Sequence, residues 1–304
     1  MPKSFFRYPE LDHATAGITA GAVTTISLHP FDLIKTRFQV DDSARKIFQR
    51  HQFGATFKTM NIIWRKYGLK GLYRGVSPNF TGATTSWGLY FYWYDLFKQK
   101  TASNNKSSEL SPIQHLVASA EAGAITALFT NPFWVIKTRM CATNIDDPRA
   151  YKGLFDGLYQ ILKYEGIRGL YRGIIPAFFG VSHGALQFMA YEEMKKWKLK
   201  IGSKEDRKKL DNLEYLLIAG SSKIFATIST YPYQLIKARL QNQSFEVKYN
   251  GVIDTIKKVF RSEGFFGFYK GLAPNILRVL PGTCTTFLVY ENMMEFFRNH
   301  ANDH

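Results

Sequence analysis

The chain has 304 residues, of which 15% are aromatic and only two are cysteine. Cys141 and Cys284 have no metal-ligand spacing and offer no basis for a disulfide framework, so we interpret both as packing residues. The net charge of +16 would suit a nucleic-acid-binding protein, and the mean hydropathy of −0.20 is low for a membrane protein, so hydropathy by itself does not indicate one.

An eight-residue pattern that begins with proline and ends with lysine-x-arginine occurs three times, about 100 residues apart. The copies are Pro30–Arg37, Pro132–Arg139 and Pro232–Arg239. An aromatic-basic-glycine tripeptide follows each copy, at Tyr73–Gly75, Tyr171–Gly173 and Tyr269–Gly271. Three copies in register predict three modules packed as a single domain over residues 1–304, with repeats at about 10–101, 112–200 and 211–300.

Each repeat is predicted to contain three helical stretches. The first begins near His13, Leu116 and Glu214, and the proline inside it is predicted to kink the helix at Pro30, Pro132 and Pro232. A short amphipathic stretch follows, at Ala55–Lys66, Leu154–Tyr164 and Val252–Arg261. The third stretch runs from the glycine of the tripeptide to about Lys98, Lys198 and Arg298. Two long helices per repeat predict six spans with both termini on one side.

Basic residues concentrate in the connections inside the repeats. Residues 41–75, 140–173 and 241–271 contain 18 Lys and Arg, whereas the connections 101–110 and 199–211 contain 6. In a membrane protein with short loops, this bias places the richer side toward the cytosol-equivalent compartment. Low hydropathy is compatible with six spans if the helices surround a water-filled cavity. The alternative is a soluble helical solenoid or a basic nucleic-acid-binding repeat protein.

The three proline patterns, with their Glu-Gly and Tyr-Arg-Gly phrases, resemble the mitochondrial carrier family over nearly the whole chain. The strings Ser86–Phe91, Asn131–Arg139 and Phe179–Phe188 are similar to its FAD and folate transporters. The resemblance implies an all-α membrane protein with six transmembrane helices in three pseudo-symmetric repeats and short amphipathic helices in the matrix. It also implies a monomer in the mitochondrial inner membrane, with its termini toward the intermembrane space, cardiolipin as a lipid partner and no nucleic acid.

In that family, an acid and a base after each proline form interhelical ion pairs that close the matrix side. Here Asp32 is the only acid, because Trp134 and Gln234 occupy the other two positions. The resemblance implies that Asp32 pairs with Lys137, which leaves two cavity-facing lysines near water or an anion. Gln39 and Gln241, one turn beyond two of the lysines, are expected to brace this gate. The expected matrix gate therefore consists of Asp32, Lys35, Lys137, Lys237, Gln39 and Gln241.

The family has a second gate on the cytoplasmic side, built from an aromatic-acid-x-x-base pattern. The matching residues are Tyr94, Asp95 and Lys98, then Tyr191, Glu192 and Lys195, then Tyr290 and Glu291. Met294 takes the place of the third base, so at most two ion pairs can form. A lysine at position 294 is expected to allow a third pair and to slow turnover.

Substrate contacts are expected between the two gates. Counting 100° per residue from the gate residues places Trp87, Tyr90, Gln187, His183 and Lys223 on or near the cavity face. Arg278 lies where the family often has a cationic contact, and Phe179 is a further aromatic candidate. The expected substrate-binding residues are Trp87, Tyr90, Phe179, His183, Gln187, Lys223 and Arg278.

These residue types suit a ligand with a planar ring and negative charge. We predict a carrier for FAD, because Lys223 and Arg278 on neighbouring helices are expected to converge on one pyrophosphate. The alternatives are folate, or a nucleotide or dinucleotide. No catalytic constellation or metal-binding motif is evident, so an enzyme is not predicted, and FAD is expected as transported substrate rather than as cofactor.

Overall fold

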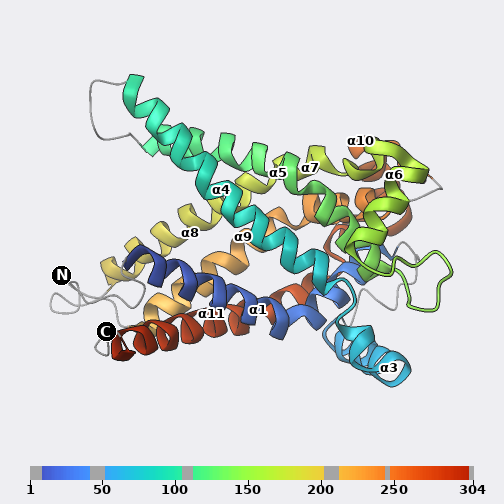
Figure 1. Cartoon of the computed structure of the whole chain (residues 1–304), viewed down its shortest axis with the longest axis horizontal. Coiled ribbons are helices and arrows are strands. Elements are labelled where there is room, and N and C mark those ends of the chain that lie inside the picture. Colours follow the sequence, from blue (N-terminus) through green and yellow to red (C-terminus); the bar gives the residue numbers. More distant parts are fainter. Residues whose placement is uncertain (1–8, 42–51, 105–111, 202–211, 244–246, 301–304) are drawn as a thin grey trace.

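The structure, a computed structural model, describes residues 9–41, 52–104, 112–201, 212–243 and 247–300, which contain helices and no strand. Long helices run along the molecule, and the first and last of them begin and end, respectively, at the same end of it (Figure 1). These are α1 (Pro9–Val40), α4 (Val76–Asn104), α5 (Pro112–Ala142), α8 (Gly180–Ile201), α9 (Asn212–Asn242) and α11 (Leu272–His300). Shorter helices gather at the opposite end: α3 (Gln52–Leu72), α6 (Leu154–Leu170), α7 (Ile174–Phe178), α10 (Val252–Glu263) and η2 (Phe265–Tyr269).

The three prolines lie inside helices, as predicted. α1, α5 and α9 each continue through Pro30, Pro132 or Pro232 for about three further turns. The chain then carries the lysine and arginine of the repeated pattern on the last turns of these helices. The basic ends of all three helices are therefore delivered to the same end of the molecule (Figure 1).

The amphipathic stretches form helices at the predicted places, but two of them run further than the sequence pattern indicated. α3 and α6 are merged with a following turn across Gly68 and Gly166, whose φ angles are 61° and 66°. Gly264, with a φ of 71°, ends α10 at the matching position. A residue without Cβ adopts this backbone conformation easily, so the glycine after each stretch redirects the chain.

The third stretch of the second repeat is interrupted, where the sequence predicted a continuous helix. α7 ends at Phe178 and α8 begins at Gly180. The Ser182 hydroxyl donates to the Phe179 carbonyl over 2.6 Å, so a side chain binds a carbonyl within the first turn of α8. Phe179 lies between the two helices, with helical backbone angles of φ −69° and ψ −8°.

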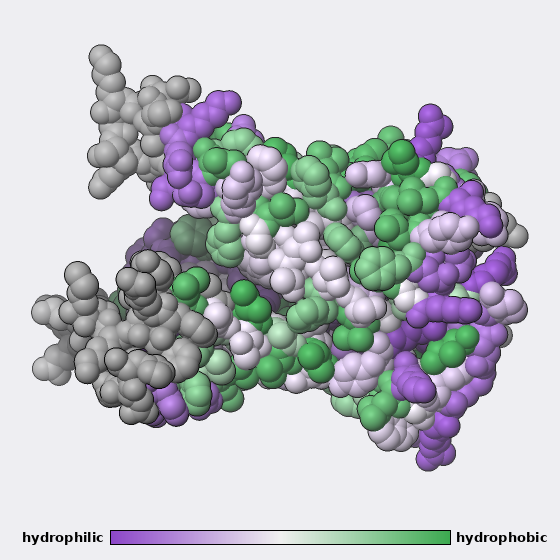
Figure 2. Space-filling model, viewed as in Figure 1, coloured by the Kyte–Doolittle hydropathy of each residue, from purple (hydrophilic) through white to green (hydrophobic). Residues whose placement is uncertain are grey.

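The long helices close into a ring. Each contacts the next one in chain order, and α11 returns to α1. α1, α5 and α9 also contact one another, so the proline-containing helices meet at the centre. Figure 2 shows apolar residues across the middle of one face, hydrophilic residues at the end with α3, α6 and α10, and a hollow at the other end between α4 and the α1–α11 pair.

Within the described ranges, no single helix is both long and apolar enough to be recognised as a membrane span from its composition, although one bent pair, Leu154–Leu170 with Ile174–Lys200, reaches that level across an angle of 58°.

Candidate functional site

The arginines that end the three sequence patterns link the repeats in cyclic order. The Nε atom of Arg37 donates to the Cys141 carbonyl, that of Arg139 to the Gln241 carbonyl and that of Arg239 to the Gln39 carbonyl, each over 3.0 Å. Each acceptor lies at the same position of the next repeat in the cycle. We call Arg37, Arg139 and Arg239 the arginine ring; it ties together the ends of α1, α5 and α9.

The residue before each proline ties its helix to the aromatic-basic-glycine tripeptide. The acceptor is the carbonyl of the basic residue in each repeat. His29 Nε2 lies 2.9 Å from the Arg74 oxygen, Asn131 Nδ2 donates to the Arg172 oxygen over 3.3 Å, and the Tyr231 hydroxyl donates to the Lys270 oxygen over 3.0 Å. Pattern matching missed these residues because the three side chains differ chemically, although each can bind a carbonyl oxygen.

The glycine of each tripeptide permits a close approach between repeats. Gly75, Gly173 and Gly271 have φ angles of 80°, 74° and 83°. A Cβ at these positions would lie 3.4, 3.1 and 2.8 Å from the carbonyl oxygens of Lys137, Lys237 and Lys35. Glycine is thus required at these positions both for its conformation and for the space it leaves to the following repeat.

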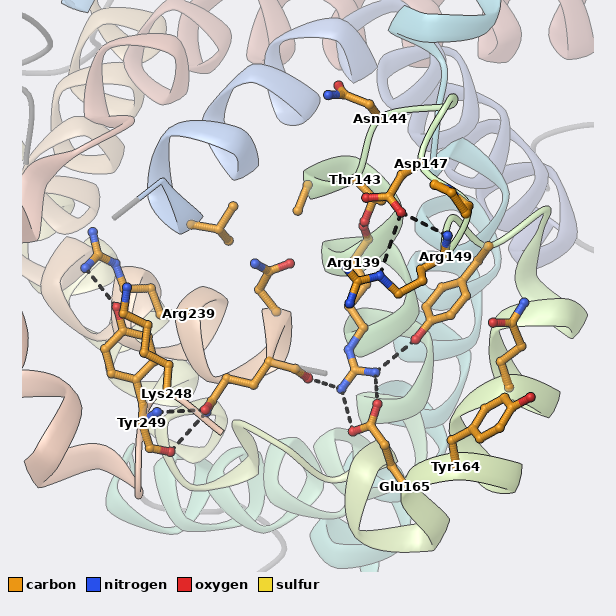
Figure 3. Close-up of a pocket in the computed structure, with 17 residues that line it drawn as sticks. Arg139, Thr143, Asn144, Asp147, Arg149, Tyr164, Glu165, Arg239, Lys248 and Tyr249 are labelled. Carbon is orange, nitrogen blue, oxygen red and sulfur yellow. Dashed lines mark hydrogen bonds and ion pairs between the residues drawn. The ribbon is translucent and has the colours of Figure 1, made fainter. Parts of the chain in front are cut away.

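Two carboxylates neutralise the arginine ring in the second and third repeats. Glu165 accepts from both terminal nitrogens of Arg139 over 2.5 and 3.0 Å, and Glu263 does the same with Arg239 over 2.6 and 2.9 Å. Figure 3 shows Glu165 facing the guanidinium of Arg139, beside a cavity of about 710 Å³ that Arg239 also lines. All four side chains are buried. The Glu-Gly phrase was the sequence signal for this partner.

Each carboxylate also contacts the basic residue of its tripeptide. Arg172 Nε lies 3.2 Å from Glu165, and Lys270 Nζ lies 2.8 Å from Glu263. Burial lowers the pKa of Arg172, and the Glu165 carboxylate opposes that shift. Each carboxylate therefore lies between two cations, an arrangement that fits a strong charge-assisted network.

The expected matrix-gate lysines and glutamines meet around one cavity of about 260 Å³. It is lined by Lys35, Lys137, Lys237, Gln39 and Gln241, together with Trp134 and Gln234. Lys35 Nζ donates to the Gln234 side-chain oxygen over 3.2 Å, so an amide at the position equivalent to Asp32 accepts a hydrogen bond from the lysine. In the described part of the chain, Lys137 and Lys237 have no hydrogen-bonded or ion-paired partner.

The expected ion pair between Asp32 and Lys137 is wrong for this structure, because Asp32 pairs with Arg278. The Asp32 side chain is buried, and α11 packs along α1, so Arg278 reaches the carboxylate from the neighbouring helix. The Arg278 side chain remains 39% exposed. The only acid of the matrix gate is therefore joined to an expected substrate-binding cation.

The two glutamines expected to brace the gate behave differently. Gln241 accepts from the Thr138 hydroxyl over 3.0 Å and donates to the Asn131 side chain over 3.4 Å, so it connects α9 to α5. The Gln39 side chain is buried, and its Nε2 has no hydrogen-bond partner within the described residues. Gln241 thus links two repeats through its side chain. Gln39 links two repeats through its backbone carbonyl, and its side chain also contacts the Tyr231 side chain of the third repeat.

The residues of the expected cytoplasmic-side gate lie apart. Among the residues that the structure describes, no ion pair joins Asp95, Lys98, Glu192, Lys195 and Glu291 to one another. The Tyr94 and Tyr290 hydroxyls lie 2.8 and 2.7 Å from ring nitrogens of His115 and His13 on adjacent helices, and Tyr191 is half-buried. This end of the molecule is the hollowed one in Figure 2.

Met294 is buried with Ala16 and Phe297 rather than presented to the opposite helices. A lysine there would have to leave the contact between α1 and α11 before it could form an ion pair. The expectation that it completes the gate is therefore not supported by its surroundings, and its main effect would be on packing.

The expected substrate-binding residues occupy several helices. Tyr90 stacks on Tyr94 at 6.1 Å between ring centroids, and Trp87 lies edge-on to Tyr90 at 6.5 Å, with 63% of Trp87 exposed. His183 Nδ1 lies 2.9 Å from the Thr230 hydroxyl, and both Lys223 and Lys35 are close enough to His183 to interact electrostatically. Gln187 on α8 is half-buried.

Phe179 is 58% exposed and does not line the lysine cavity, although its neighbours Ala177 and Gly180 do. Trp134 lines that cavity instead, and its indole nitrogen donates to the Thr130 hydroxyl over 3.3 Å. Trp134 lies at the third position of the eight-residue pattern, where the first repeat has Asp32. An aromatic side chain next to the lysines thus takes the place of an acid.

The family model described as mitochondrial carrier protein matches residues 7–105, 108–202 and 208–301. The chain is 41% identical to folate transporter 1, chloroplastic, of Arabidopsis thaliana, over 95% of this chain and 96% of that protein. It is 40% identical to nicotinamide adenine dinucleotide transporter 2, mitochondrial, of the same plant, over 94% of this chain and 79% of that protein. It is 36% identical to the mitochondrial FAD carrier protein FLX1 of Saccharomyces cerevisiae, over 91% and 94%. All three relatives are named as transporters or carriers.

Proposed function

Since the chain belongs to the mitochondrial carrier protein family, we propose that it carries FAD across the mitochondrial inner membrane by alternating access. Its relatives are named for folate, nicotinamide adenine dinucleotide and FAD at 41%, 40% and 36% identity, a range too narrow to rank the three substrates. Folate and a nicotinamide dinucleotide are the alternative substrates of the same transport cycle.

The observation that supports this proposal most is the charge of the central bundle. Lys35, Lys137, Lys237, Lys223 and Arg278 provide five cations from α1, α5, α9 and α11, and Asp32 is the carboxylate that pairs with one of them. Unpaired cations inside a bundle are costly unless water or an anion contacts them. An anionic substrate that replaces water there gains strong charge-assisted hydrogen bonds.

The aromatic row on α4 supports a planar ring system in the same substrate. Trp87 and Tyr90 form a row of contacting rings with Tyr94 on α4, and Trp134 lines the lysine cavity. FAD has an isoalloxazine and an adenine ring with a pyrophosphate between them. Aromatics at two levels along the bundle, with cations between them, suit two ring systems separated by an anion, whereas folate has its carboxylates at one end, beyond both of its rings.

Exposed apolar side chains support membrane insertion. Large hydrophobic residues are exposed on all long helices, among them Ile18, Phe91, Leu116, Phe188, Phe225 and Phe287. Figure 2 shows the apolar surface that such residues form across the middle of the molecule. Water would make so large an apolar surface unfavourable, whereas lipid would not. We assign the basic end with α3, α6 and α10 to the matrix, and both termini to the intermembrane space.

The arrangement of the two ends supports alternating access from the intermembrane space. The arginine ring and the contacts among α1, α5 and α9 close the proposed matrix side. The other end is hollow in Figure 2, and no ion pair joins its expected gate residues in the described part of the chain. A substrate anion entering there would compete with Asp32 for Arg278 and so weaken the ion pair that links α1 to α11.

Transport by purified protein in liposomes tests the site. We expect Lys223→Ala and Arg278→Gln each to lower labelled FAD uptake by tenfold or more, since each removes a cation from the proposed substrate cavity (about 1.4 kcal/mol or more). Arg261→Ala on the exposed face of α10 is the matched control and should transport normally. The double variant Asp32→Asn/Arg278→Gln removes both charges of the pair and separates loss of a substrate contact from an unpaired carboxylate. Normal uptake by both single variants would contradict the site.

Competition tests the substrate. With labelled FAD outside the liposomes, excess unlabelled FAD should abolish uptake of label, and folate or a nicotinamide dinucleotide should reduce it weakly. Fast uptake of labelled folate or nicotinamide dinucleotide, with FAD neither entering nor competing, would replace FAD by that substrate. The carrier function would be unaffected by that result.

A further inference from the structure

The first repeat has two basic residues, Arg37 and Arg74, at the positions whose equivalents bind one glutamate in each of the other repeats, and no carboxylate among the described residues joins them. In the other repeats, Glu165 and Glu263 precede the positive-φ glycine and bind two basic residues each. The matching residue before Gly68 is Tyr67. Arg37 is equivalent to Arg139 and Arg239, the arginines that the glutamates bind. Arg74 is equivalent to Arg172 and Lys270, the second cations of those networks.

The bonds of these two arginines go to backbone carbonyls. Arg37 donates to Cys141, and Arg74 donates to Met140 over 2.8 Å and to Tyr151 over 3.4 Å. Neither forms an ion pair in the described part of the chain, and the two guanidiniums are close enough to repel each other. Both are half-buried, so the surrounding water screens this repulsion only in part.

The nearby carboxylates are engaged with other groups. The Tyr67 hydroxyl donates to Asp146 over 2.9 Å, and Lys66 pairs with the same carboxylate over 3.1 Å. Asp147 acts electrostatically on Arg74, but its ion pair is with Arg149. Burial lowers the pKa of Arg74, which is the expected result for a cation without a close anion.

We propose that Arg37 and Arg74 form a binding site for an oxyanion, with phosphate as its chemical type, at the place where a glutamate carboxylate lies in the other two repeats. The two sister networks provide the template, since a carboxylate between equivalent bases makes bonds of 2.5 to 3.2 Å there. Guanidinium groups bind phosphate and carboxylate oxygens in the same forked geometry. The basic surface at this end also raises the local concentration of anions.

This site differs from the proposed transport site. It lies at the junction of α1, α3 and the end of α5, and neither arginine lines the lysine cavity. The oxyanion can be free phosphate or the phosphate of a lipid headgroup. Its role in either case is to neutralise the first repeat and stabilise the closed end, so its test is independent of the transported substrate.

Thermal unfolding of the purified full-length protein in neutral detergent tests the proposal. Sodium phosphate is titrated against sodium chloride at constant ionic strength. Because phosphate stabilises folded proteins in general, the readout is the difference between variants. We expect the phosphate-dependent rise in Tm of the wild type to exceed that of Arg74→Gln and Arg37→Gln by about 3 °C or more at saturation.

Supplying the carboxylate is the complementary test. Tyr67→Glu should have a higher Tm than the wild type in chloride, and the extra response to phosphate should be lost because the glutamate occupies the site. Tyr67→Phe keeps the ring and should retain the response. Lys257→Gln removes one exposed charge from α10 and should also retain it. If either the arginine variants or Tyr67→Glu fail to fold, the other set decides.

The source of the phosphate is distinguished by adding anionic phospholipid to the micelles. A lipid-dependent rise in Tm that Tyr67→Glu lacks, with no specific response to inorganic phosphate, identifies a lipid headgroup. A specific response to inorganic phosphate in lipid-free micelles identifies a soluble anion. Equal responses of the wild type, Tyr67→Glu and Arg74→Gln to both additions would overturn the proposal.

Discussion

The first repeat and the other two build the same junction from different chemistry. In all three, the terminal arginine donates to a backbone carbonyl of the next repeat in the cycle over 3.0 Å. Only the second and third add a buried glutamate, while the first has Tyr67, whose hydroxyl binds an exposed aspartate instead. The backbone contacts thus define the geometry of the ring, and the carboxylates set its charge.

This division has an energetic consequence. A backbone acceptor contributes a similar hydrogen bond in each repeat, about 1 kcal/mol or somewhat more with a charged donor. A buried carboxylate between two cations is different, because removing it leaves cations without compensation at a cost of about 3–5 kcal/mol. The first repeat avoids that dependence, since its two arginines are only half-buried.

The largest effect is expected from Glu263→Gln, which removes the charge from the more deeply buried network. Arg239 and Lys270 would both lose their carboxylate while their side chains stay almost fully buried. We expect a loss of about 3–5 kcal/mol in the free energy of unfolding. Thermal unfolding in detergent should show a fall in Tm on the order of 10 °C. Glu295→Gln, an exposed position on α11, is the matched control and should unfold like the wild type.

Glu165→Gln should have a smaller effect of the same kind. The second cation of this network, Arg172, has 22% of its side chain exposed, so water can compensate part of its charge. We expect a loss of about 2–3 kcal/mol, between the values for a charged hydrogen bond and for a fully buried pair. A Tm as low as that of Glu263→Gln would show that exposure of Arg172 does not moderate the cost.

Tyr231→Phe tests a contact that all three repeats share. It removes the hydroxyl that donates to Lys270, and it keeps the buried ring. We expect a loss of about 1–1.5 kcal/mol, the usual contribution of one buried hydrogen bond. Tyr215→Phe on an exposed ring serves as the control for the same chemical change. Equal unfolding temperatures for both variants would mean that the link from α9 to the tripeptide contributes nothing.

Tyr67→Phe should have the smallest effect, because the bond it removes is at the surface. The Asp146 side chain is 60% exposed and keeps its ion pair with Lys66. We expect a change in the free energy of unfolding within about 0.5 kcal/mol. A loss as large as that of Tyr231→Phe would mean that Tyr67 replaces the glutamate energetically, and the contrast between the repeats would then disappear.

Much of the site could be predicted because it repeats. The lysines and glutamines around the 260 Å³ cavity occupy equivalent positions, and helical periodicity places equivalent positions on equivalent faces. The residues before the prolines escaped prediction because His29, Asn131 and Tyr231 are different residue types. They bind equivalent backbone carbonyls through chemically different side chains. The interruption at Phe179 also escaped prediction, because the sequence there is compatible with a continuous helix.

The sequence by itself determined the three repeats, the helices that continue through their prolines, and the absence of two of the three gate acids, since each of these depends only on residue type and local spacing. The tertiary structure decided the partners. Asp32 has cations available on α5 and on α11, and charge alone cannot rank them. Arg278 forms the ion pair with Asp32 because α11 packs along α1 and brings the two side chains together. An ion pair requires charged atoms within about 4 Å of each other. Met294 is buried for the same reason, since the packing of α11 against α1 covers it.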